Sequence, residues 1–355
     1  MANEITTLST TAPEEETVDG ESEATPVSLG KRFLDIRTLV SFGVAFAILY
    51  FVFAKMDVDF GDIAARISTA NPFYYLVAMA IYYSTFLVRS LRWRVLLENA
   101  GLDRGSGYRL PSVLGLAEIV FLSWFANCIM PAKLGDAYRA FLLKRSSQVS
   151  FSRTFGTILA ERIVDLLLTF VLLALTGLIA FRGTLPPSIM VGMQASLVLV
   201  VGVIVGLVAM RHLGGTIRRF LPDRLEVQYG RFEQGTLHSF RRLPLVLGFS
   251  VLAWVIEASR LYFVLMSLGL GDISLPVVLF TAIAGSLLTS LPGTPAGLGF
   301  VESVIIGILL LANSLGLVSG IDTGVATSVA ILDRTISYWS LVIFGLIAYL
   351  LTKRK

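Results

Sequence analysis

Long apolar segments, separated by short charged stretches, follow one another along the chain from residue 36 to its end. A helix needs about 20 apolar residues to cross the hydrocarbon core of a bilayer. The pattern therefore predicts an all-α polytopic membrane protein, and segment 57–70 predicts a short interfacial helix. The apolar segments lie near residues 36–55, 72–97, 110–130, 154–181, 187–210, 244–268, 275–291, 300–318 and 323–351.

A short frame of sequence occurs twice in the apolar region. The frame Pro-Ala-Lys-Leu-Gly from Pro131 to Gly135 returns as Pro-Ala-Gly-Leu-Gly from Pro295 to Gly299. Two further marks recur in the same order, an arginine followed at equal spacing by Gly-Leu and an acid-Arg pair. These marks are Arg92 with Gly101, Arg260 with Gly269, Glu161-Arg162 and Asp333-Arg334. We infer a duplication, with one membrane repeat in residues 31–181 and a second in residues 182–352.

Each half is expected to contain a hairpin. Segment 132–153 carries too much charge for a helix that faces lipid. With segment 110–130 it predicts a hairpin inside the protein with its tip at 127–136, where irregular backbone is tolerated. Segment 275–318 predicts a second hairpin, with its tip at 291–299. Following the chain places the tips on opposite faces, which predicts two inverted-topology repeats, each with a re-entrant or broken-helix hairpin. The residues that shape the tips are Pro131, Gly135, Pro292, Gly293, Pro295, Gly297 and Gly299.

The distribution of charge predicts the orientation. Segment 211–243 is rich in arginine and residues 353–355 are all basic, which is typical of cytoplasmic segments. We therefore expect a multi-pass protein of the plasma or inner membrane with both termini in the cytoplasm. Segment 1–30 is acidic and polar, which predicts a disordered tail. Three arginines near the end of the second apolar segment are interpreted as interface anchors and topology signals: Arg89, Arg92 and Arg94.

The motifs together resemble a known family. The first half contains Arg92-Trp93, Asn127, the frame from Pro131 with Asp136 and Arg139, and Glu161-Arg162 with Asp165, and the second half contains Leu291 to Gly299 with Glu302. This pattern resembles the flippase-like family, also called the lysylphosphatidylglycerol synthase transmembrane region. The resemblance implies a membrane region that flips a modified phospholipid, or one that works beside glycosyltransferases using polyprenyl-linked sugars. Because no aminoacyl-transferase domain follows the last apolar segment, we expect a stand-alone member without synthase activity.

Moving such a lipid requires its anionic head to be shielded from hydrocarbon, because a charge at the bilayer centre costs about 2.5–3.5 kcal/mol. Basic side chains and free backbone N–H groups at a broken helix suit phosphate oxygens. The predicted ligands of the lipid head are Lys133, Asp136, Arg139, Arg162, Arg334 and Asn127. The predicted charge partners or coupling groups are Glu161, Asp165, Glu257, Arg260, Glu302 and Asp333.

Structural roles compete with these functional ones. Neighbouring residues point in different directions on a helix, so Glu161 and Arg162 are each expected to pair with a partner elsewhere. Glu257 and Arg260 are expected to pair with each other at i, i+3. Asn127 is expected to cap exposed backbone at the hairpin tip. Glu118, in an apolar segment, remains a functional candidate.

The expected function is transport of an anionic phospholipid or a polyprenyl-phosphate-linked lipid, with membrane lipids as partners. One alternative is a membrane-embedded transferase that uses Asp136, Arg139, Glu161 and Arg162. Another is a non-catalytic partner of a cytoplasmic glycosyltransferase or lipid-modifying enzyme. The sequence contains no nucleotide-binding glycine loop, metal-ligand cluster or Ser-His-Asp arrangement, so we expect no cofactor, no metal and no nucleic-acid partner. Cys128 is the single cysteine, which excludes an internal disulfide, and no motif indicates an oligomeric state.

Overall fold

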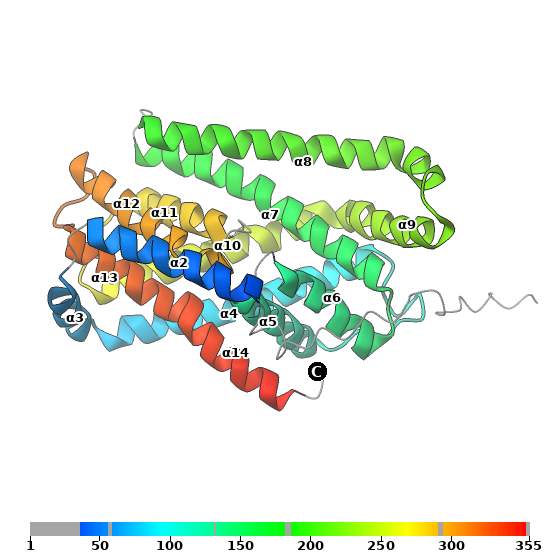
Figure 1. Ribbon diagram of the computed structural model, residues 1–355, viewed down its shortest axis with the longest axis horizontal. Coiled ribbons are helices and arrows are strands. Elements are labelled where there is room, and N and C mark those ends of the chain that lie inside the picture. The colour runs from blue at the N-terminus through cyan, green and yellow to red at the C-terminus, as the bar shows by residue number, and fades with distance from the viewer. Residues whose placement is uncertain (1–35, 56–58, 131–132, 182–185, 290–293, 353–355) are drawn as a thin grey trace, which may run out of the picture.

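The computed structural model describes residues 36–55, 59–130, 133–181, 186–289 and 294–352, and its regular elements in these ranges are helices (Figure 1). The first half contains α2 (Ile36–Lys55), α3 (Phe60–Ser68), α4 (Pro72–Asn99), α5 (Val113–Ile129), α6 (Leu134–Ser147) and α7 (Phe151–Ala180). The second half contains α8 (Pro187–Arg219), α9 (Asp223–His238), η1 (Ser239–Arg242), α10 (Leu243–Ser267), α11 (Leu275–Thr289), η2 (Pro295–Gly297), α12 (Phe300–Ser314), α13 (Thr323–Arg334), η3 (Thr335–Trp339) and α14 (Ser340–Leu351).

The predicted fold class is confirmed, because the described chain is helical and contains 6 helices long and apolar enough to cross a membrane. Helices α5 and α11 are apolar but shorter. The ends of α5 and α11 lie close to those predicted from the apolar pattern, because a proline follows each helix within three residues. The predicted interfacial segment contains α3, whose first turn is capped by the side chain of Asp59. The protein is therefore a multi-pass, all-α membrane protein.

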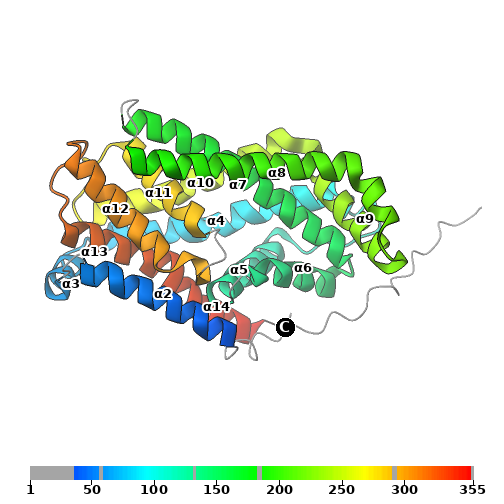
Figure 2. The ribbon, with the colours of Figure 1, turned by 45° about the horizontal axis from the view of Figure 1, so that its top comes forward.

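Two helical hairpins lie at opposite ends of the bundle. Helices α5 and α6 lie at the end that carries α9, whereas α11 and α12 lie at the end that carries α3 (Figures 1 and 2). The hairpins meet near the middle, because α5 of the first contacts η2 of the second. The relation of the two halves as inverted repeats stays a prediction.

The long helices α4 and α10 pack side by side and end in the same way. Gly101 follows α4 with a φ of 78°, and Gly269 follows α10 with a φ of 76°. In both cases the next N–H returns to a carbonyl of the last helical turn: Leu102 to Leu97 at 2.9 Å, and Leu270 to Leu265 at 3.0 Å. Glycine suits this left-handed position because it has no Cβ. The repeated Arg and Gly-Leu marks thus share one local structure.

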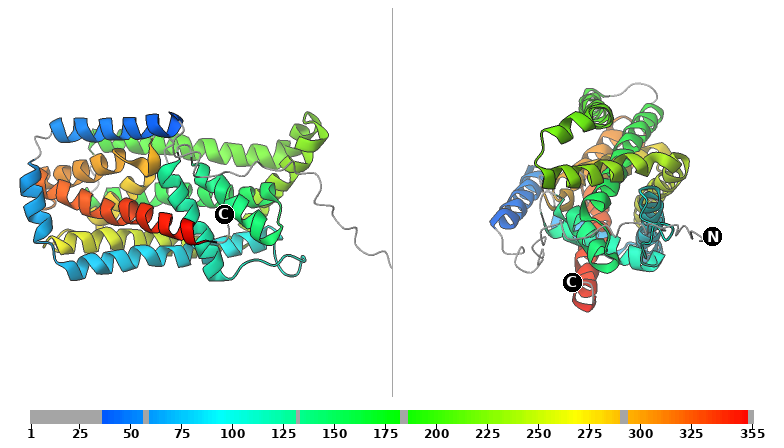
Figure 3. Two further views of the ribbon diagram at one scale, coloured as in Figure 1. Left: turned by 60° about the horizontal axis from the view of Figure 1, so that its bottom comes forward. Right: turned by 90° about the vertical axis from the view of Figure 1, so that its right-hand side faces the viewer.

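Segment 211–243, which we expected to be a basic loop, is mostly helical. Helix α8 continues to Arg219, and α9 and η1 follow it. Arg218 of α8 pairs with Glu233 of α9 at 2.7 Å. Helix α9 packs tightly on α7, where Gly235 lies so close to the carbonyl of Arg153 that a Cβ would clash. Figure 3 shows α9 at the end of the molecule opposite α3. Arginine and glutamate favour helices, so a charged segment such as this one can continue a helix.

Several predictions fall outside the described residues. These are the tail 1–30, the basic residues 353–355, and Pro131, Pro292 and Gly293 of the two tips.

Candidate functional site

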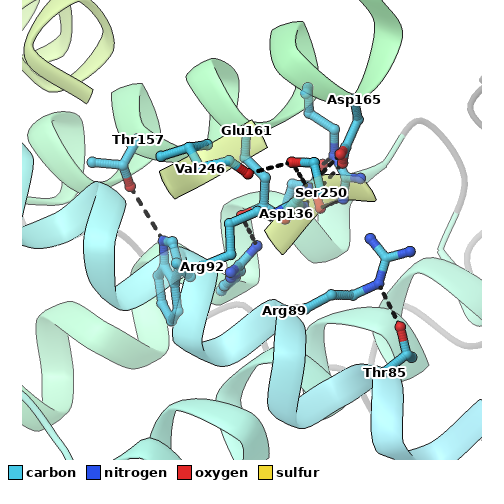
Figure 4. Close-up of polar contacts among 12 residues, drawn as sticks. Thr85, Arg89, Arg92, Asp136, Thr157, Glu161, Asp165, Val246 and Ser250 are labelled. Atoms are coloured by element: carbon cyan, nitrogen blue, oxygen red, sulfur yellow. Dashed lines mark hydrogen bonds and ion pairs between the residues drawn. The ribbon is translucent and has the colours of Figure 1, made fainter. Parts of the chain in front are cut away.

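Arg92 of α4 lies at the centre of a buried ion-pair network. Its side chain is fully buried and donates to Glu161 at 2.8 Å, to both carboxylate oxygens of Asp165, and to the hydroxyl of Ser250 at 2.8 Å (Figure 4). A buried charge is tolerated when it is paired and hydrogen-bonded in this way. The interpretation of Arg92 as an interface anchor is therefore wrong, because helix packing brings its acids from α7 to enclose it.

Arg139 of α6 completes this network from the other side. It donates to the second carboxylate oxygen of Glu161 at 2.9 Å. Its guanidinium lies 3.8 Å from the ring centroid of Trp93, whose indole N–H donates to Thr157 at 3.2 Å. A guanidinium above an indole is favourable when both are shielded from water. Glu161 thus joins α4, α6 and α7 through two arginines.

The tip of the first hairpin is held by Asn127, Asp136 and Arg162. The Asn127 side chain accepts from the N–H of Gly135 at 2.9 Å and donates to Asp136 at 3.2 Å. Arg162 holds both oxygens of Asp136, at 2.9 and 2.8 Å. The prediction that Asn127 caps backbone at the tip is confirmed. Gly135 is required by close packing, because a Cβ there would lie 2.6 Å from the Asn127 oxygen.

The tip of the second hairpin is held by Arg334, the counterpart of Arg162. Arg334 donates to Glu302 at 2.9 Å and to the carbonyl of Ala296 at 3.1 Å. Glu302 in turn accepts from the N–H of Gly299 at 2.7 Å, at the start of α12. In each half, the arginine of the acid-Arg pair, Arg162 or Arg334, therefore binds residues at a hairpin tip. The predicted tip residues Pro295 and Gly297 are buried in η2.

The acid of each pair instead binds the repeated arginine of a long helix. Glu161 binds Arg92, and Asp333 binds Arg260. Arg260 also donates to Glu257 at 2.9 Å, which confirms the predicted i, i+3 pair. The prediction that members of the acid-Arg pairs bind different partners is also confirmed. The sequence marks of the duplication are thus the residues that form equivalent bridges.

Lys133 begins α6 in an unusual conformation. Its φ of 57° and ψ of 30° lie in the left-handed region, and Gly297, at the aligned position, has a φ of 71°. A residue with a Cβ is disfavoured there by roughly 1–2 kcal/mol. Strain of this kind often occurs at functional sites. It directs attention to the Lys133 side chain.

A cavity of about 430 Å³ lies between the two tips. Charged side chains from both halves line it: Arg89, Lys133, Asp136, Arg162, Asp165, Glu257, Arg260, Asp333 and Arg334. Apolar and small side chains of α11 and α12, including Ala282, Gly285 and Ile305, form much of the remaining wall. The cavity therefore combines charged and apolar lining residues.

Two cations on this cavity have no carboxylate partner among the described residues. Lys133 makes no ion pair or hydrogen bond there, and Arg89 donates only to the hydroxyl of Thr85 at 3.2 Å. The Arg89 guanidinium lies 4.6 Å from the ring centroid of Trp124. Figure 4 shows the hydrogen bond between Arg89 and Thr85, beside the group of acids that surrounds Arg92. Arg89 is buried, so its interpretation as an interface anchor is also wrong.

The structure separates the predicted ligands into two sets. Asn127, Lys133, Asp136, Arg162 and Arg334 line the cavity, whereas Arg139 is fully buried behind its wall. Arg89 lines the cavity but was not among the predicted ligands. The equal spacing of Arg92 and Arg260 from their Gly-Leu marks was the available signal for the roles of these two arginines.

Comparison with known proteins agrees with the observed architecture. The family described as the lysylphosphatidylglycerol synthase TM region matches residues 39–345. A UPF0104 membrane protein of Methanocaldococcus jannaschii is 35% identical over 232 residues, which cover 65% of this chain and 95% of that protein. A UPF0104 membrane protein of Pyrococcus horikoshii is 25% identical, covering 77% of this chain and 85% of that protein. Glycosyltransferase AglD of Haloferax volcanii is 23% identical, covering 84% of this chain and 52% of that protein.

Proposed function

Because the chain belongs to the lysylphosphatidylglycerol synthase TM region family, we propose that it moves an anionic phospholipid or a polyprenyl-phosphate-linked lipid across the membrane. The observation that carries this proposal is the cavity between the two hairpin tips, where Lys133 and Arg89 lie without carboxylate partners among the described residues. An uncompensated cation within the bilayer is costly. An anionic ligand supplies the missing charge.

Each polar residue then has a distinct role. Lys133 and Arg89 bind the phosphate oxygens by charge and by N–H donation. Arg162 and Arg334 hold the tips through Asp136 and Glu302, so they position the binding groups and contribute positive charge to the cavity wall. Arg92, Arg139 and Glu161 lie behind the wall and fix the angle between α4, α6 and α7. They are positioning residues.

The hairpins explain how such a site serves both faces of the membrane. One hairpin lies at each end of the bundle (Figure 2), and residues of both hairpins line the cavity. Small movements of one hairpin against the other then open the cavity to one end at a time, as in transporters with a site at the midplane. We place the end that carries α9 in the cytoplasm, because its arginines obey the positive-inside rule.

Transport is tested with the purified protein in liposomes that contain a fluorescent phospholipid or a fluorescent polyprenyl phosphate. The wild-type protein is expected to accelerate the movement of at least one probe between leaflets. A double variant, Arg89→Gln with Lys133→Gln, is expected to slow it by about tenfold or more, because hydrogen bonds to charged groups contribute about 1.5–3 kcal/mol.

The matched control is Arg94→Gln, on the same helix as Arg89. Arg94 pairs with Glu98 at 3.1 Å at the surface, so its loss should leave transport unchanged. Equal rates with and without protein for both lipids would refute the transport proposal.

A second candidate function follows from the likeness to glycosyltransferase AglD, of which the matched region covers about half. On this basis we propose that the chain also works beside a glycosyltransferase that uses a polyprenyl-linked sugar, without being an enzyme itself. A purified protein that converts such a lipid to a new product would favour the embedded transferase instead.

A further inference from the structure

The two halves contribute opposite charge imbalances to the cavity region. Among the described residues there, the first half supplies more cations than acids, and the second half supplies more acids than cations. The first-half groups are Arg89, Arg92, Lys133, Arg139 and Arg162 against Asp136, Glu161 and Asp165. The second-half groups are Arg260 and Arg334 against Glu257, Glu302 and Asp333. The bound anion compensates the excess positive charge of the first half. It does not compensate the excess of acids in the second half.

Glu257 is the acid that lacks full compensation. It is 7% exposed and lines the cavity. One of its oxygens accepts from Arg260 at 2.9 Å, but the other, Oε2, is buried without a hydrogen-bond partner. Arg260 is shared, because it also pairs with Asp333. Two carboxylates that compete for one guanidinium in a poorly solvated place favour a bound proton on one of them.

The charged groups around Glu257 make no hydrogen bond to its Oε2. On its own helix it faces Arg260, and α13 contributes Asp333 and Arg334, of which Arg334 is engaged with Glu302. Helix α4 contributes Tyr82, whose hydroxyl donates to the carbonyl of Ser337 at 3.0 Å, and Arg89. Helix α7 contributes Arg162 and Asp165 to the same cavity. Helix α11 has no titratable side chain. Arg242 of η1 pairs with Glu98.

We propose that Glu257 binds an exchangeable proton that is taken up together with the anionic lipid. The proposal rests on the lipid transport proposed above. The step forms one O–H bond at Oε2 and involves no electron transfer, because the carboxylate becomes a carboxylic acid. An anion held at Lys133 and Arg89 makes the shared cavity more negative, which strengthens proton binding at Glu257. By linkage, the proton strengthens lipid binding by the same factor.

A proton suits this place better than a metal cation. A metal cation needs several oxygen ligands around it. Among the described residues, no group of three His, Cys, Asp or Glu side chains is arranged to hold a metal. Glu257 offers one free oxygen. A single acceptor is enough for a proton.

The proton itself is detected by infrared spectroscopy of the full-length protein in lipid, independently of transport. With the anionic lipid probe present, a carbonyl band of a buried carboxylic acid is expected at neutral pH in the wild type and in Glu118→Gln, whose wild-type side chain accepts from Thr352 at 2.6 Å outside this cavity. The band should disappear in Glu257→Gln. Glu257→Asp keeps an acid and should retain a band. A wild type without the band, or a band that persists in Glu257→Gln, would overturn the proposal.

Coupling is then measured in the liposomes with an imposed pH gradient. One unit of pH gradient should enrich the lipid probe by up to about tenfold on the alkaline side if one proton accompanies one lipid. Glu257→Gln should show no enrichment by the gradient. Enrichment that persists in this variant, or that follows a sodium gradient instead, would overturn the coupling. A wild type that moves no lipid but shows the infrared band would refute the transport proposal and leave the proton site standing.

Discussion

Arg162 binds Asp136 through two parallel hydrogen bonds of 2.9 and 2.8 Å, and this pair fastens α7 to the tip of the first hairpin. The geometry is specific to arginine, whose planar guanidinium matches a carboxylate at two points. Arg334 fastens α13 to the second tip through Glu302 and the carbonyl of Ala296. Because each tip borders the cavity, the stability of these bridges determines how well the binding groups are positioned.

Asp136→Asn should destabilise the protein by roughly 2–3 kcal/mol, because it leaves the Arg162 guanidinium without a carboxylate. This loss is somewhat smaller than that expected when one partner of a fully buried ion pair is removed. Thermal unfolding in detergent measures the change. Arg162→Lys should lose part of the same stability, since a lysine makes one contact in place of two. Glu98→Gln, at the surface pair with Arg94, should cost less than about 1 kcal/mol. Equal losses for Asp136→Asn and Glu98→Gln would argue against a structural bridge at the tip.

Lys133→Gly separates the strain at the tip from the charge. Glycine accepts the left-handed conformation that Lys133 adopts, so the variant should be about 1 kcal/mol more stable than the wild type. It should nevertheless transport the anionic lipid about tenfold more slowly, because a charged donor is lost. Gln148 is also left-handed, with a φ of 53°, and lies at the end of α6 away from the tip. Gln148→Gly should therefore gain similar stability without slowing transport, and unchanged transport in Lys133→Gly would contradict the role of the lysine.

Gly135→Ala should prevent the first tip from closing. The added Cβ would meet the carbonyl of Ser123 and the side-chain oxygen of Asn127. Overpacking of this kind costs typically 1–3 kcal/mol, and we expect transport to be lost with it. Gly192→Ala, in α8, meets no atom within 4 Å and should be neutral or slightly stabilising. Unfolding measurements and the liposome assay compare the two variants, and a fully active Gly135→Ala would show that the tip does not need this close contact.

Cysteine labelling tests the orientation of the two hairpins. In a Cys128→Ser background, cysteines replace Ser106, between α4 and α5, and Ser319, between α12 and α13, both of which are exposed. A membrane-impermeant thiol reagent should label these two positions from opposite sides of the membrane. Phe220→Cys, between α8 and α9, should label from the same side as Ser106→Cys, which we expect to be cytoplasmic. Labelling of Ser106→Cys and Ser319→Cys from one side would exclude opposite hairpins.

Much of the fold was predictable because its signals are local. An apolar helix must be long enough to cross the bilayer, so each span can be recognised from one continuous apolar segment of the sequence. The pair between Glu257 and Arg260 follows from the helical period, and the left-handed ends at Gly101 and Gly269 follow from glycine itself. The equivalent bridges of the two halves, in contrast, join residues far apart in the chain. Their exact partners were not predictable.

The sequence by itself determined which segments form the apolar helices and which of their residues carry charge. Only the tertiary structure decided which charges are compensated. Packing of α4 against α7 buries Arg92 with its acids and turns Arg89 toward the cavity, although both lie on one helix. The same packing places Arg139 behind the wall and leaves one oxygen of Glu257 unpaired. Pairing depends on distances between helices, and the helical period alone does not fix these distances.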